Sequence, residues 1–289
     1  MRETSGGTES SDSPRPRADE GVMTPRSYVE YYTSCRGIGV DDVGVAPIVV
    51  LSWGERVIKS LADSLCAKRC PNWFYDDEHI VYPLYRATIS DAQISFAQVP
   101  EGAPATVMMM EEMIACGARI FLSLGWAGSL QKSAPVGTIL IPTSCLREEG
   151  TSSHYLPSGE ACSPDPGLSQ IMIQAAGTEG CDVVTGPVWT TDAPYRELPE
   201  KVLEYQRNGV VGVDMESSAM LSLGVFRKVR VCNLLVISDE IWGGWNPAFR
   251  SAELREATVR AERVIIRCLK AYLESTKAME ESETMDKET

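Results

Sequence analysis

Short apolar runs alternate with longer amphipathic segments along most of this 289-residue chain. The apolar runs predict buried strands at 47–51, 92–99, 118–124, 136–142, 182–189 and 231–240. The amphipathic segments predict helices that begin after Gly54 and that span 105–116, 166–176, 198–208 and 252–273. Strands that alternate with helices through short connections indicate an α/β fold with helices on both faces of one sheet.

The two ends of the chain differ in composition from the part between them. Residues 1–25 are rich in Ser, Gly, Pro and charge, and they predict a disordered tail because they hold too little apolar surface to bury. Residues 275–289 are also polar, and we expect a second, frayed tail there. Residues 26–274 are expected to form a single domain, since they contain neither a repeat nor a linker-like stretch.

The composition argues against several classes of protein. A formal net charge of −13 does not suit a nucleic-acid-binding protein, which usually needs a basic surface. No run of about 18 apolar residues occurs, so we expect no membrane span, and the first residues lack the apolar core of a secretory signal. Nine cysteines without a C-x-x-C pair and only two histidines predict reduced thiols in a cytoplasmic protein, and no metal site.

One candidate site begins where the short apolar run at 209–213 ends in Asp214, Met215 and Glu216, directly before a predicted helix. Either carboxylate can cap the free N–H groups of that helix and gain from its dipole. Alternatively, Glu216 can accept hydrogen bonds from two neighbouring sugar hydroxyls, because each carboxylate oxygen takes one O–H donor. Met215 would then be the apolar surface beneath the sugar.

A second carboxylate, Asp239, follows the run 234–238 at the end of a predicted strand. An acid that is partly removed from water there holds a proton more readily and suits a general acid. A Ser-Asp pair is also a common helix cap, so the residues alone leave both interpretations open. Ligands of α/β sheets bind at the carboxyl ends of strands, so we expect Glu216 and Asp239 to face one pocket.

Two further segments carry candidate binding residues. The segment 125–128, Gly-Trp-Ala-Gly, follows a predicted strand, and its glycines predict a tight turn whose backbone can approach a ligand closely. The segment 189–197 gathers polar, aromatic and proline residues, and it can cap a flat ring by stacking. An ordinary turn and a rigid surface loop are the structural alternatives for the two segments.

Four segments occur in an order and spacing that are typical of a known family: GARIFLSLGWAGSLQKSAPVGTILIPT (117–143), TGPVWTTDAPYRE (185–197), VVGVDMESSAML (210–221) and VCNLLVISDE (231–240). They resemble the nucleoside phosphorylases of the uridine phosphorylase and hexameric purine nucleoside phosphorylase type, a superfamily that also holds the methylthioadenosine nucleosidases. The resemblance covers roughly residues 46–270. It implies a three-layer α/β/α sandwich around a mixed, partly barrel-like central sheet, and a homo-oligomer that is a dimer or a hexamer.

The resemblance also implies roles for the acidic residues. Glu216 would bind the ribose hydroxyls, Met215 would pack against the sugar, and Asp239 would protonate a departing purine base. Arg250 is the candidate basic partner that assists the acid, with Arg255 as the alternative. Since pyrimidine-specific relatives generally lack the acid, Asp239 favours a purine.

Other positions complete the substrate site that the resemblance implies. Pro194 and Tyr195 fall where the family places a base-lining aromatic residue. The further candidates for substrate binding are Asp214, Gly128 and Trp126.

The positions that would hold phosphate depart from the family pattern. These phosphorylases carry a Gly-Asp-Pro-x-Arg loop after the first strand, where this chain reads Ser-Trp-Gly-Glu-Arg at 52–56. Gly54 and Arg56 remain as candidate phosphate-binding residues, with a helix N-terminus behind them. Ser123 stands where a second phosphate-binding Arg is expected, and Trp126 takes the place of a phosphate-contacting Ser or Thr.

These residues predict an enzyme that cleaves the ribosyl C1′–N bond of a nucleoside, with a purine favoured. Phosphate would be the co-substrate, the products would be the free base and ribose 1-phosphate, and no cofactor is implied. The altered phosphate positions leave hydrolysis by water open as an alternative reaction. A nucleoside-binding protein without catalytic activity is a second alternative, because fold and sugar-binding residues alone do not require turnover.

Overall fold

The computed structural model describes residues 21–76 and 81–287 of the chain. Most of the predicted N-terminal tail lies outside the described residues. The first helix, α1 (Pro25–Arg36), begins where that tail was expected to end. Thr24 caps this helix by accepting a hydrogen bond from the backbone N–H of Ser27, and Pro25 fits the first turn because its missing N–H is not needed there.

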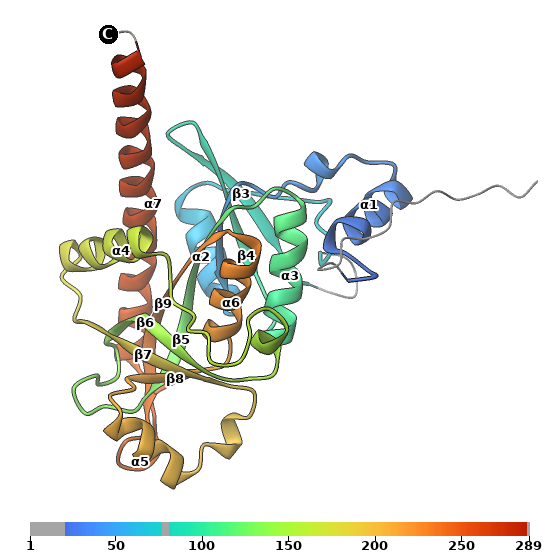
Figure 1. Cartoon of the computed structure of the whole chain (residues 1–289). Coiled ribbons are helices and arrows are strands. Elements are labelled where there is room, and N and C mark those ends of the chain that lie inside the picture. Colours follow the sequence, from blue (N-terminus) through green and yellow to red (C-terminus); the bar gives the residue numbers. More distant parts are fainter. Residues whose placement is uncertain (1–20, 77–80, 288–289) are drawn as a thin grey trace, which may run out of the picture.

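The described elements alternate between strands and helices (Figure 1). The remaining helices are α2 (Glu55–Ser64), α3 (Ala103–Ala115), α4 (Pro166–Thr178), α5 (Pro199–Arg207), α6 (Ser217–Arg227) and α7 (Ala252–Lys287). The strands are β1 (Ile48–Ser52), β2 (Lys68–Arg69), β3 (Leu84–Ile89), β4 (Ala92–Gln98), β5 (Ile120–Ser129), β6 (Ile139–Glu148), β7 (Val183–Thr191), β8 (Gly212–Asp214), β9 (Arg230–Glu240) and β10 (Asn246–Pro247). Short 3₁₀ helices are η1 (Val40–Val43), η2 (Thr151–His154) and η3 (Pro194–Arg196).

All these strands belong to one sheet, in the order β10-β9-β6-β7-β8-β5-β1-β4-β3-β2. Because β5 also pairs in parallel with β9, the strands β5, β9, β6, β7 and β8 close into a ring. Parallel pairs such as β1–β5 and β6–β7 are combined with the antiparallel pairs β5–β8 and β6–β9. The predicted mixed sheet with a partly barrel-like region is therefore confirmed.

Helices cover both faces of the sheet and make the three predicted layers (Figure 1). On one face, Met110 of α3 and Leu223 of α6 are buried in a core that also holds a residue of α1. On the other face, Leu61 of α2 and Ile265 of α7 are buried in a second core together with α4. Burial of each such side chain contributes roughly 2 kcal/mol, so these two cores hold the sheet and its strand ends in place.

The strand β5 differs from its predicted form. A tight turn was expected at 125–128, but β5 continues through these residues to Ser129. The reason is that this part of the strand has partners on two sides: it pairs with β9 throughout and then with β8 from Gly128. The prediction of a turn is wrong, and a bulge between Ala127 and Gly128 provides the only irregularity in the β5–β9 register.

The last helix is longer than predicted. A polar tail was expected from residue 275, whereas α7 continues to Lys287 and projects beyond the sheet (Figure 1). The added residues include Glu, Lys and Met, which have high helix propensity. Neither α1 nor β3 had a predicted counterpart.

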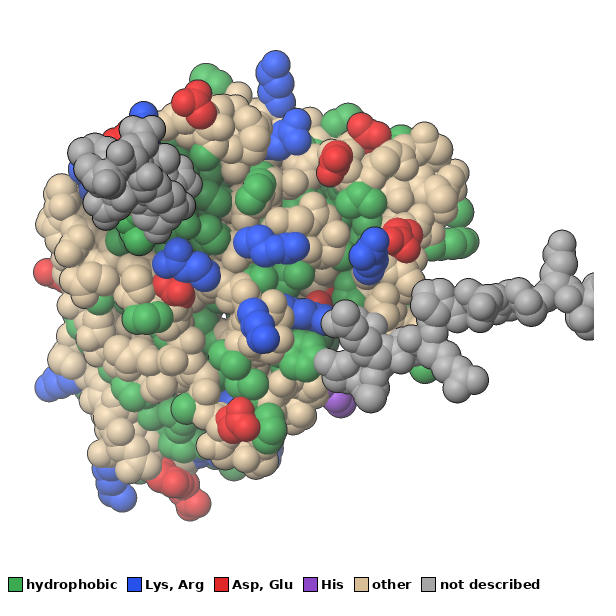
Figure 2. Space-filling model, turned by 45° about the horizontal axis from the view of Figure 1, so that its top comes forward, with side chains coloured by type: hydrophobic (Ala, Val, Ile, Leu, Met, Phe, Trp, Pro, Cys, Tyr) green, Lys and Arg blue, Asp and Glu red, His purple; other side chains and the backbone are tan. Residues whose placement is uncertain are grey.

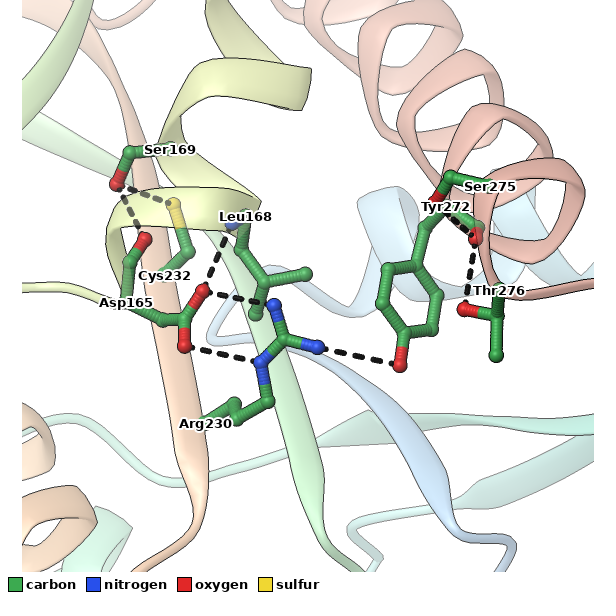
Figure 3. A network of polar contacts seen from close by, with 8 residues as sticks. All are labelled: Asp165, Leu168, Ser169, Arg230, Cys232, Tyr272, Ser275 and Thr276. Atoms are coloured by element: carbon green, nitrogen blue, oxygen red, sulfur yellow. Dashed lines mark hydrogen bonds and ion pairs between the residues drawn. The ribbon is translucent and has the colours of Figure 1, made fainter. Parts of the chain in front are cut away.

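Arg230 joins three elements at the start of β9 (Figure 3). Its Nε and Nη2 donate hydrogen bonds of 2.9 Å to the two carboxylate oxygens of Asp165, and its Nη1 donates one of 3.3 Å to the hydroxyl of Tyr272 in α7. Asp165 is also the N-cap of α4, since its Oδ1 accepts from the backbone N–H of Leu168 at 2.8 Å. The pKa of Asp165 is lowered, and the largest cause is its hydrogen bond with the Arg230 guanidinium.

The surface carries charges of both signs. On the face shown in Figure 2, basic and acidic side chains are interspersed with apolar groups. Within the described part of the chain, no helix combines the length and the apolar character that a bilayer crossing requires.

Candidate active site

A cleft of about 980 Å³ lies where the ends of β1, β5, β8 and β9 come together. Ser52 at the end of β1, Gly128 near the end of β5, Asp214 at the end of β8 and Asp239 near the end of β9 all line it. Residues of the segments 53–57, 194–203 and 241–249 and Glu101 contribute to the remaining walls. Its volume suits a small organic ligand, and its position at strand ends is the usual ligand position in such sheets.

Glu216 lies at the N-cap position of α6, but its side chain does not cap that helix. Instead, its Oε1 accepts a hydrogen bond of 2.6 Å from the backbone N–H of Gly102, which has a left-handed φ of 94° at the start of α3. Burial, followed by the nearby charge of Asp214, raises the pKa of Glu216. Glu216 and Met215 both line the cleft, so the capping interpretation is wrong for Glu216.

Asp214 is the carboxylate that caps α6. Its Oδ2 accepts from the backbone N–H of Ser217 at 3.0 Å, and its Oδ1 accepts from the hydroxyl of Thr190 at 2.7 Å. Burial raises the pKa of Asp214, and these hydrogen bonds oppose that effect. Asp214 lines the cleft, but its bonds also give it a structural function, because they hold the strand-to-helix junction that positions Glu216.

Asp239 lies within β9 and is 9% exposed, so the alternative of a helix cap is wrong. Its Oδ1 accepts from the hydroxyl of Ser238 at 2.8 Å, and its Oδ2 accepts from the indole N–H of Trp245 at 3.0 Å. Gly128 lies opposite Asp239 in the β5–β9 pairing. A Cβ at Gly128 would stand 3.2 Å from Val213, which is tight, and at an ordinary contact distance of 3.5 Å from Oδ2 of Asp239, so this position lies directly beside the carboxylate.

The structure therefore brings Glu216 and Asp239 to one cleft from two different strand ends, as the strand-end argument predicted. Glu216 reaches it from the β8–α6 junction, and Asp239 reaches it from β9.

Glu197 is a further acid of this cleft, and the sequence motifs gave it no role. It follows η3 and precedes α5, and burial raises its pKa to about 7, with a further contribution from the charge of Asp239. A carboxyl group of this kind holds a proton over part of the neutral pH range and is able to donate it. The available signal was its place at the end of the family segment 185–197.

Six aromatic residues line the cleft: Trp53, Trp126, Tyr195, Trp242, Trp245 and Phe249. Tyr195 is fully exposed, Trp245 is 68% exposed, and Pro194 lines the cleft beside Tyr195. Exposed aromatic rings around a cleft are typical of a surface that binds a ligand or a partner. The sequence motifs pointed to Tyr195 and Trp126 but not to Trp245 and Phe249, which lie beyond the last family segment, 231–240.

Two indole rings occupy the side of the cleft where phosphate was expected. Trp53 packs against β5 so closely that a Cβ at Gly125 would stand 2.7 Å from its ring, and its N–H donates to the hydroxyl of Thr106 at 2.9 Å. Trp126 is 46% exposed, and its N–H lies 3.4 Å from the hydroxyl of Thr258 in α7. Ser123 is fully buried in β5, away from the cleft lining.

The predicted basic residues do not reach this cleft. Gly54 lines it as the N-cap of α2, but Arg56 is exposed and is absent from the lining. Arg250 is also exposed and outside the lining, and its backbone carbonyl accepts a 2.7 Å hydrogen bond from the guanidinium of Arg255. The structure therefore does not place Arg250 or Arg255 beside Asp239.

The charged side chains of the cleft are all acidic. Glu101, Glu197, Asp214, Glu216 and Asp239 line it, and none of the described lining residues is Lys, Arg or His. Outside the lining, the Nζ of Lys132 lies 5.5 Å from the centroid of the Trp242 ring. In the described part of the chain, no cluster of three or more His, Cys, Asp or Glu side chains has an arrangement that could hold a metal ion.

Comparison with known proteins assigns this chain to a family. Residues 48–274 match the model of the phosphorylase superfamily. The chain therefore belongs to the phosphorylase superfamily, as the four sequence segments predicted. The relatives that match this chain are nucleoside phosphorylases, which are pentosyltransferases, and the prediction of an enzyme of the nucleoside phosphorylase kind is confirmed.

Individual relatives differ in the nucleoside that their names specify. The chain is 24% identical over 174 residues to a guanosine phosphorylase of Halorubrum lacusprofundi. The aligned part covers 58% of this chain and 72% of that protein. It is 30% identical over 171 residues to a uridine phosphorylase of Treponema pallidum, with 55% and 66% of the two chains covered. These matches span about two thirds of each relative, and they name both purine and pyrimidine nucleosides.

A solved structure confirms the fold. The purine nucleoside phosphorylase of Toxoplasma gondii, in complex with immucillin-H, superposes with a TM-score of 0.72 at 22% identity. The match covers 82% of this chain and 95% of that chain, so the sandwich architecture is shared across almost the whole relative.

Proposed function

We propose that this chain cleaves the C1′–N bond between ribose and a purine base. Glu216 accepts hydrogen bonds from the ribose hydroxyls, Met215 packs against the sugar, and Asp239 protonates the departing base. Pro194 and Tyr195 contact the face of the base, and Gly128 and Trp126 line the cleft near it. The observation that carries this proposal is the meeting of Glu216 and Asp239 in one cleft from two strand ends.

The two carboxyl groups suit different stages of this reaction. As the C1′–N bond breaks, positive charge develops on the ribose, and carboxylates nearby stabilise it. The leaving base gains electron density at the same time, and a proton from an acid lowers the barrier to its departure. Glu197 lies in the same cleft with its pKa raised to about 7, so it is suited to resupply that proton to Asp239 at neutral pH.

Phosphate is the proposed attacking group, because the named relatives are phosphorylases. The products would be the free base and ribose 1-phosphate, and no cofactor takes part. On this chain, Gly54 at the start of α2 is the predicted phosphate-side residue that lines the cleft, and Arg56 does not. Because the phosphate dianion needs a cation nearby, we expect a neighbouring subunit of a dimer or hexamer to supply one.

Hydrolysis is a second candidate reaction, and a specific observation favours it. Trp53 and Trp126 fill space on the side where phosphate would bind, and the described lining offers no cationic side chain. Water needs neither the space nor the charge. Under this candidate the products are the free base and free ribose.

One assay separates these candidates. The protein is incubated with adenosine, inosine, guanosine, uridine and methylthioadenosine, with and without phosphate, and base and sugar products are measured. Release that depends on phosphate and yields ribose 1-phosphate supports phosphorolysis, whereas free ribose without phosphate supports hydrolysis. Binding without release from any of the five nucleosides contradicts both and supports a non-catalytic binding protein.

A cytoplasmic location and a homo-oligomeric state belong to the same proposal. The nine cysteines carry no disulfide in the structure, which fits a reducing compartment. Exposed aromatic residues at the cleft, such as Trp245 and Phe249, are available to a neighbouring subunit.

A further inference from the structure

Two cysteines lie opposite each other at the edge of β6, outside the lining of the cleft. Cys145 pairs with Val188 of β7 on one side and forms an antiparallel bridge with Cys162 on the other. The backbone N–H of Cys145 donates a 3.2 Å hydrogen bond to the carbonyl of Cys162. Opposed residues of such a hydrogen-bonded pair have Cα atoms about 5.5 Å apart, which is within the range that a disulfide spans.

Arg147 holds the segment that runs from one cysteine to the other. Its guanidinium donates a 2.9 Å hydrogen bond to the hydroxyl of Ser152. It also donates to the backbone carbonyls of Leu156 and Glu160, at 2.7 and 3.0 Å. These bonds fix the path of the chain between the two cysteines, so the cysteines stay opposite each other in the folded protein.

The two thiols also differ in acidity. The pKa of Cys162 lies below its ordinary value because the thiol of Cys145 donates a hydrogen bond to its sulfur; the positive charge of Arg147 assists, and burial opposes the effect. The same interaction, together with burial, raises the pKa of Cys145. The first proton therefore leaves from Cys162, which makes Cys162 the nucleophile of the pair and Cys145 its resolving partner.

We propose that Cys145 and Cys162 form a site of reversible oxidation, at which a peroxide converts the two thiols into a disulfide that locks the segment between them to β6. The site lies outside the cleft, and the inference does not depend on the proposed function. A small thiol or a protein dithiol reverses the modification by thiol–disulfide exchange.

The oxidation proceeds in two balanced steps. The thiolate of Cys162 attacks one oxygen of hydrogen peroxide, the O–O bond breaks, hydroxide leaves, and Cys162 becomes a sulfenic acid. The sulfur of Cys145 then attacks the sulfur of Cys162, the S–O bond breaks, and the oxygen leaves as water with the proton of Cys145. The thiol pair loses two electrons, and the peroxide is reduced to two molecules of water once the hydroxide takes up the proton that Cys162 released.

Access to the pair depends on the surface loop beside it. Cys145 is 9% exposed and Cys162 is fully buried. Residues 157–161, directly before Cys162, are all exposed and belong to no helix or strand. A local opening of this loop is enough to admit peroxide. We therefore expect the pair to react more slowly than the exposed Cys35 and Cys66.

The segment between the cysteines braces the start of α6. The Oε2 of Glu149 accepts a 2.8 Å hydrogen bond from the backbone N–H of Ser152, and its Oε1 accepts one of 2.7 Å from the hydroxyl of Ser218 in the first turn of α6. Glu216 is the N-cap residue of the same helix. A disulfide that closes the loop around these contacts restricts its opening and so strengthens the support of α6.

Mass spectrometry tests whether the bond forms. Cys35 and Cys66 are first replaced by Ser, because exposed thiols can join two molecules. After treatment with hydrogen peroxide, alkylation of the remaining thiols and digestion, we expect a peptide that links Cys145 to Cys162 and that is lost on reduction. Cys145 and Cys162 that are both alkylated after the treatment, or that are joined to other cysteines, overturn the inference.

Cys232 and Cys268 provide a control within the same sample. Both are fully buried, and burial raises the pKa of each to about 12. The sulfur of Cys232 lies 3.5 Å from the hydroxyl of Ser169 (Figure 3). These thiols are expected to remain reduced and to be alkylated once the protein is unfolded. Oxidation of this pair to the same extent as Cys145 and Cys162 shows a general effect of peroxide and overturns the assignment of the site.

Single variants test the order of the steps. In Cys145→Ser the sulfenic acid has no resolving partner, so a dione that reacts with sulfenic acids should label Cys162. In Cys162→Ser the nucleophile is gone, and Cys145 should stay unlabelled. Labelling of Cys145 in Cys162→Ser, without labelling of Cys162 in Cys145→Ser, contradicts the roles assigned to the two thiols.

Thermal unfolding tests the lock. Closing a loop with a disulfide restricts the unfolded chain, so we expect the oxidised protein to melt at least about 5 °C above the reduced protein. Cys162→Ser should abolish this difference, and the matched control Cys181→Ser, in which both partners remain, should retain it. Equal melting temperatures of the two redox states, with the linked peptide present, overturn the lock.

Discussion

The carboxylate of Asp239 accepts a 3.0 Å hydrogen bond from the indole N–H of Trp245, across the turn that joins β9 to β10. In this hairpin Asp239 pairs with Pro247 and Glu240 pairs with Asn246. The bond links a nearly buried acid to a side chain that is 68% exposed. The orientation of the proposed acid therefore depends on a loop at the surface of the protein.

Replacing the acid tests its proposed role. Asp239→Asn keeps the shape of the side chain but removes the transferable proton, so we expect kcat for purine nucleosides to fall at least about tenfold, or about 1.4 kcal/mol of transition-state stabilisation. Steady-state assays with adenosine and inosine measure this change. The neighbouring Glu240→Gln, which does not line the cleft, is the control and should retain activity. An unchanged kcat in Asp239→Asn removes this residue from the mechanism.

The donor from Trp245 is tested separately. Trp245→Phe keeps an aromatic ring but loses the N–H, and one hydrogen bond of this kind typically contributes about 1 to 1.5 kcal/mol. We expect kcat/KM for purine nucleosides to fall about tenfold while the melting temperature stays within about 2 °C of the parent, because the side chain is mostly exposed. A variant with full activity would show that Asp239 does not need this donor.

Sugar recognition by Glu216 predicts a difference between two substrates. Glu216→Gln removes the negative charge that accepts from a pair of hydroxyls, and we expect riboside binding to weaken by at least about fivefold more than 2′-deoxyriboside binding. Calorimetry with inosine and 2′-deoxyinosine measures both affinities in one variant. Equal losses for the two ligands would contradict the role assigned to the ribose hydroxyls.

Glu112 predicts how stability depends on pH. It is 5% exposed in α3, its Oε1 accepts from the hydroxyl of Tyr75 at 2.9 Å, and its buried Oε2 has no partner in the structure. Burial raises its pKa from the ordinary carboxyl value of 4.5 to about 7, so the folded protein holds this proton more tightly than the unfolded chain does. This contribution to stability is fully present below pH 4.5 and is lost as the pH rises through about 7.

The variant Glu112→Gln should remove that dependence, because an amide cannot ionise. We expect the parent to lose up to about 3 kcal/mol of unfolding free energy relative to Glu112→Gln between pH 5 and pH 8. Urea unfolding of both proteins at several pH values gives the difference. A difference that stays constant with pH would show that Glu112 is ionised in the folded protein throughout this range.

The Arg230 network predicts that two ion pairs contribute unequally to the free energy of unfolding. Asp165→Ala removes the N-cap of α4 and the partner of Arg230 together, and we expect it to lower the unfolding free energy by about 2 kcal/mol. Arg263→Ala breaks an ion pair with Glu179 that is about half exposed on the arginine side, and it should cost less than about 0.5 kcal/mol. Similar losses in both variants would show that the network around Arg230 contributes no more than a surface pair.

Local pattern was enough to predict most of the architecture. The largely apolar runs at 47–51 and 231–237 correspond to β1 and to most of β9, since a strand covered by helices on both faces is mostly apolar. The runs also located Asp214, Glu216 and Asp239, because an acid that follows a buried strand can only lie at a strand end. The segment 125–128 was misjudged as a turn because glycine permits both conformations, and the choice depended on pairing with β8 and β9.

The sequence by itself determined the layered α/β fold, the family and the two carboxylates, because these follow from periodicity and from motifs that lie within single segments. Only the tertiary structure decided which groups surround those carboxylates. Glu197 and Trp53 reach the cleft from distant segments, Trp245 reaches it by the folding of the loop after β9, and Arg56 and Arg250 do not reach it at all. Contacts between remote segments depend on how the sheet closes and how its loops pack, so the all-acidic, aromatic character of the cleft becomes visible only when β1, β5, β8 and β9 are brought together.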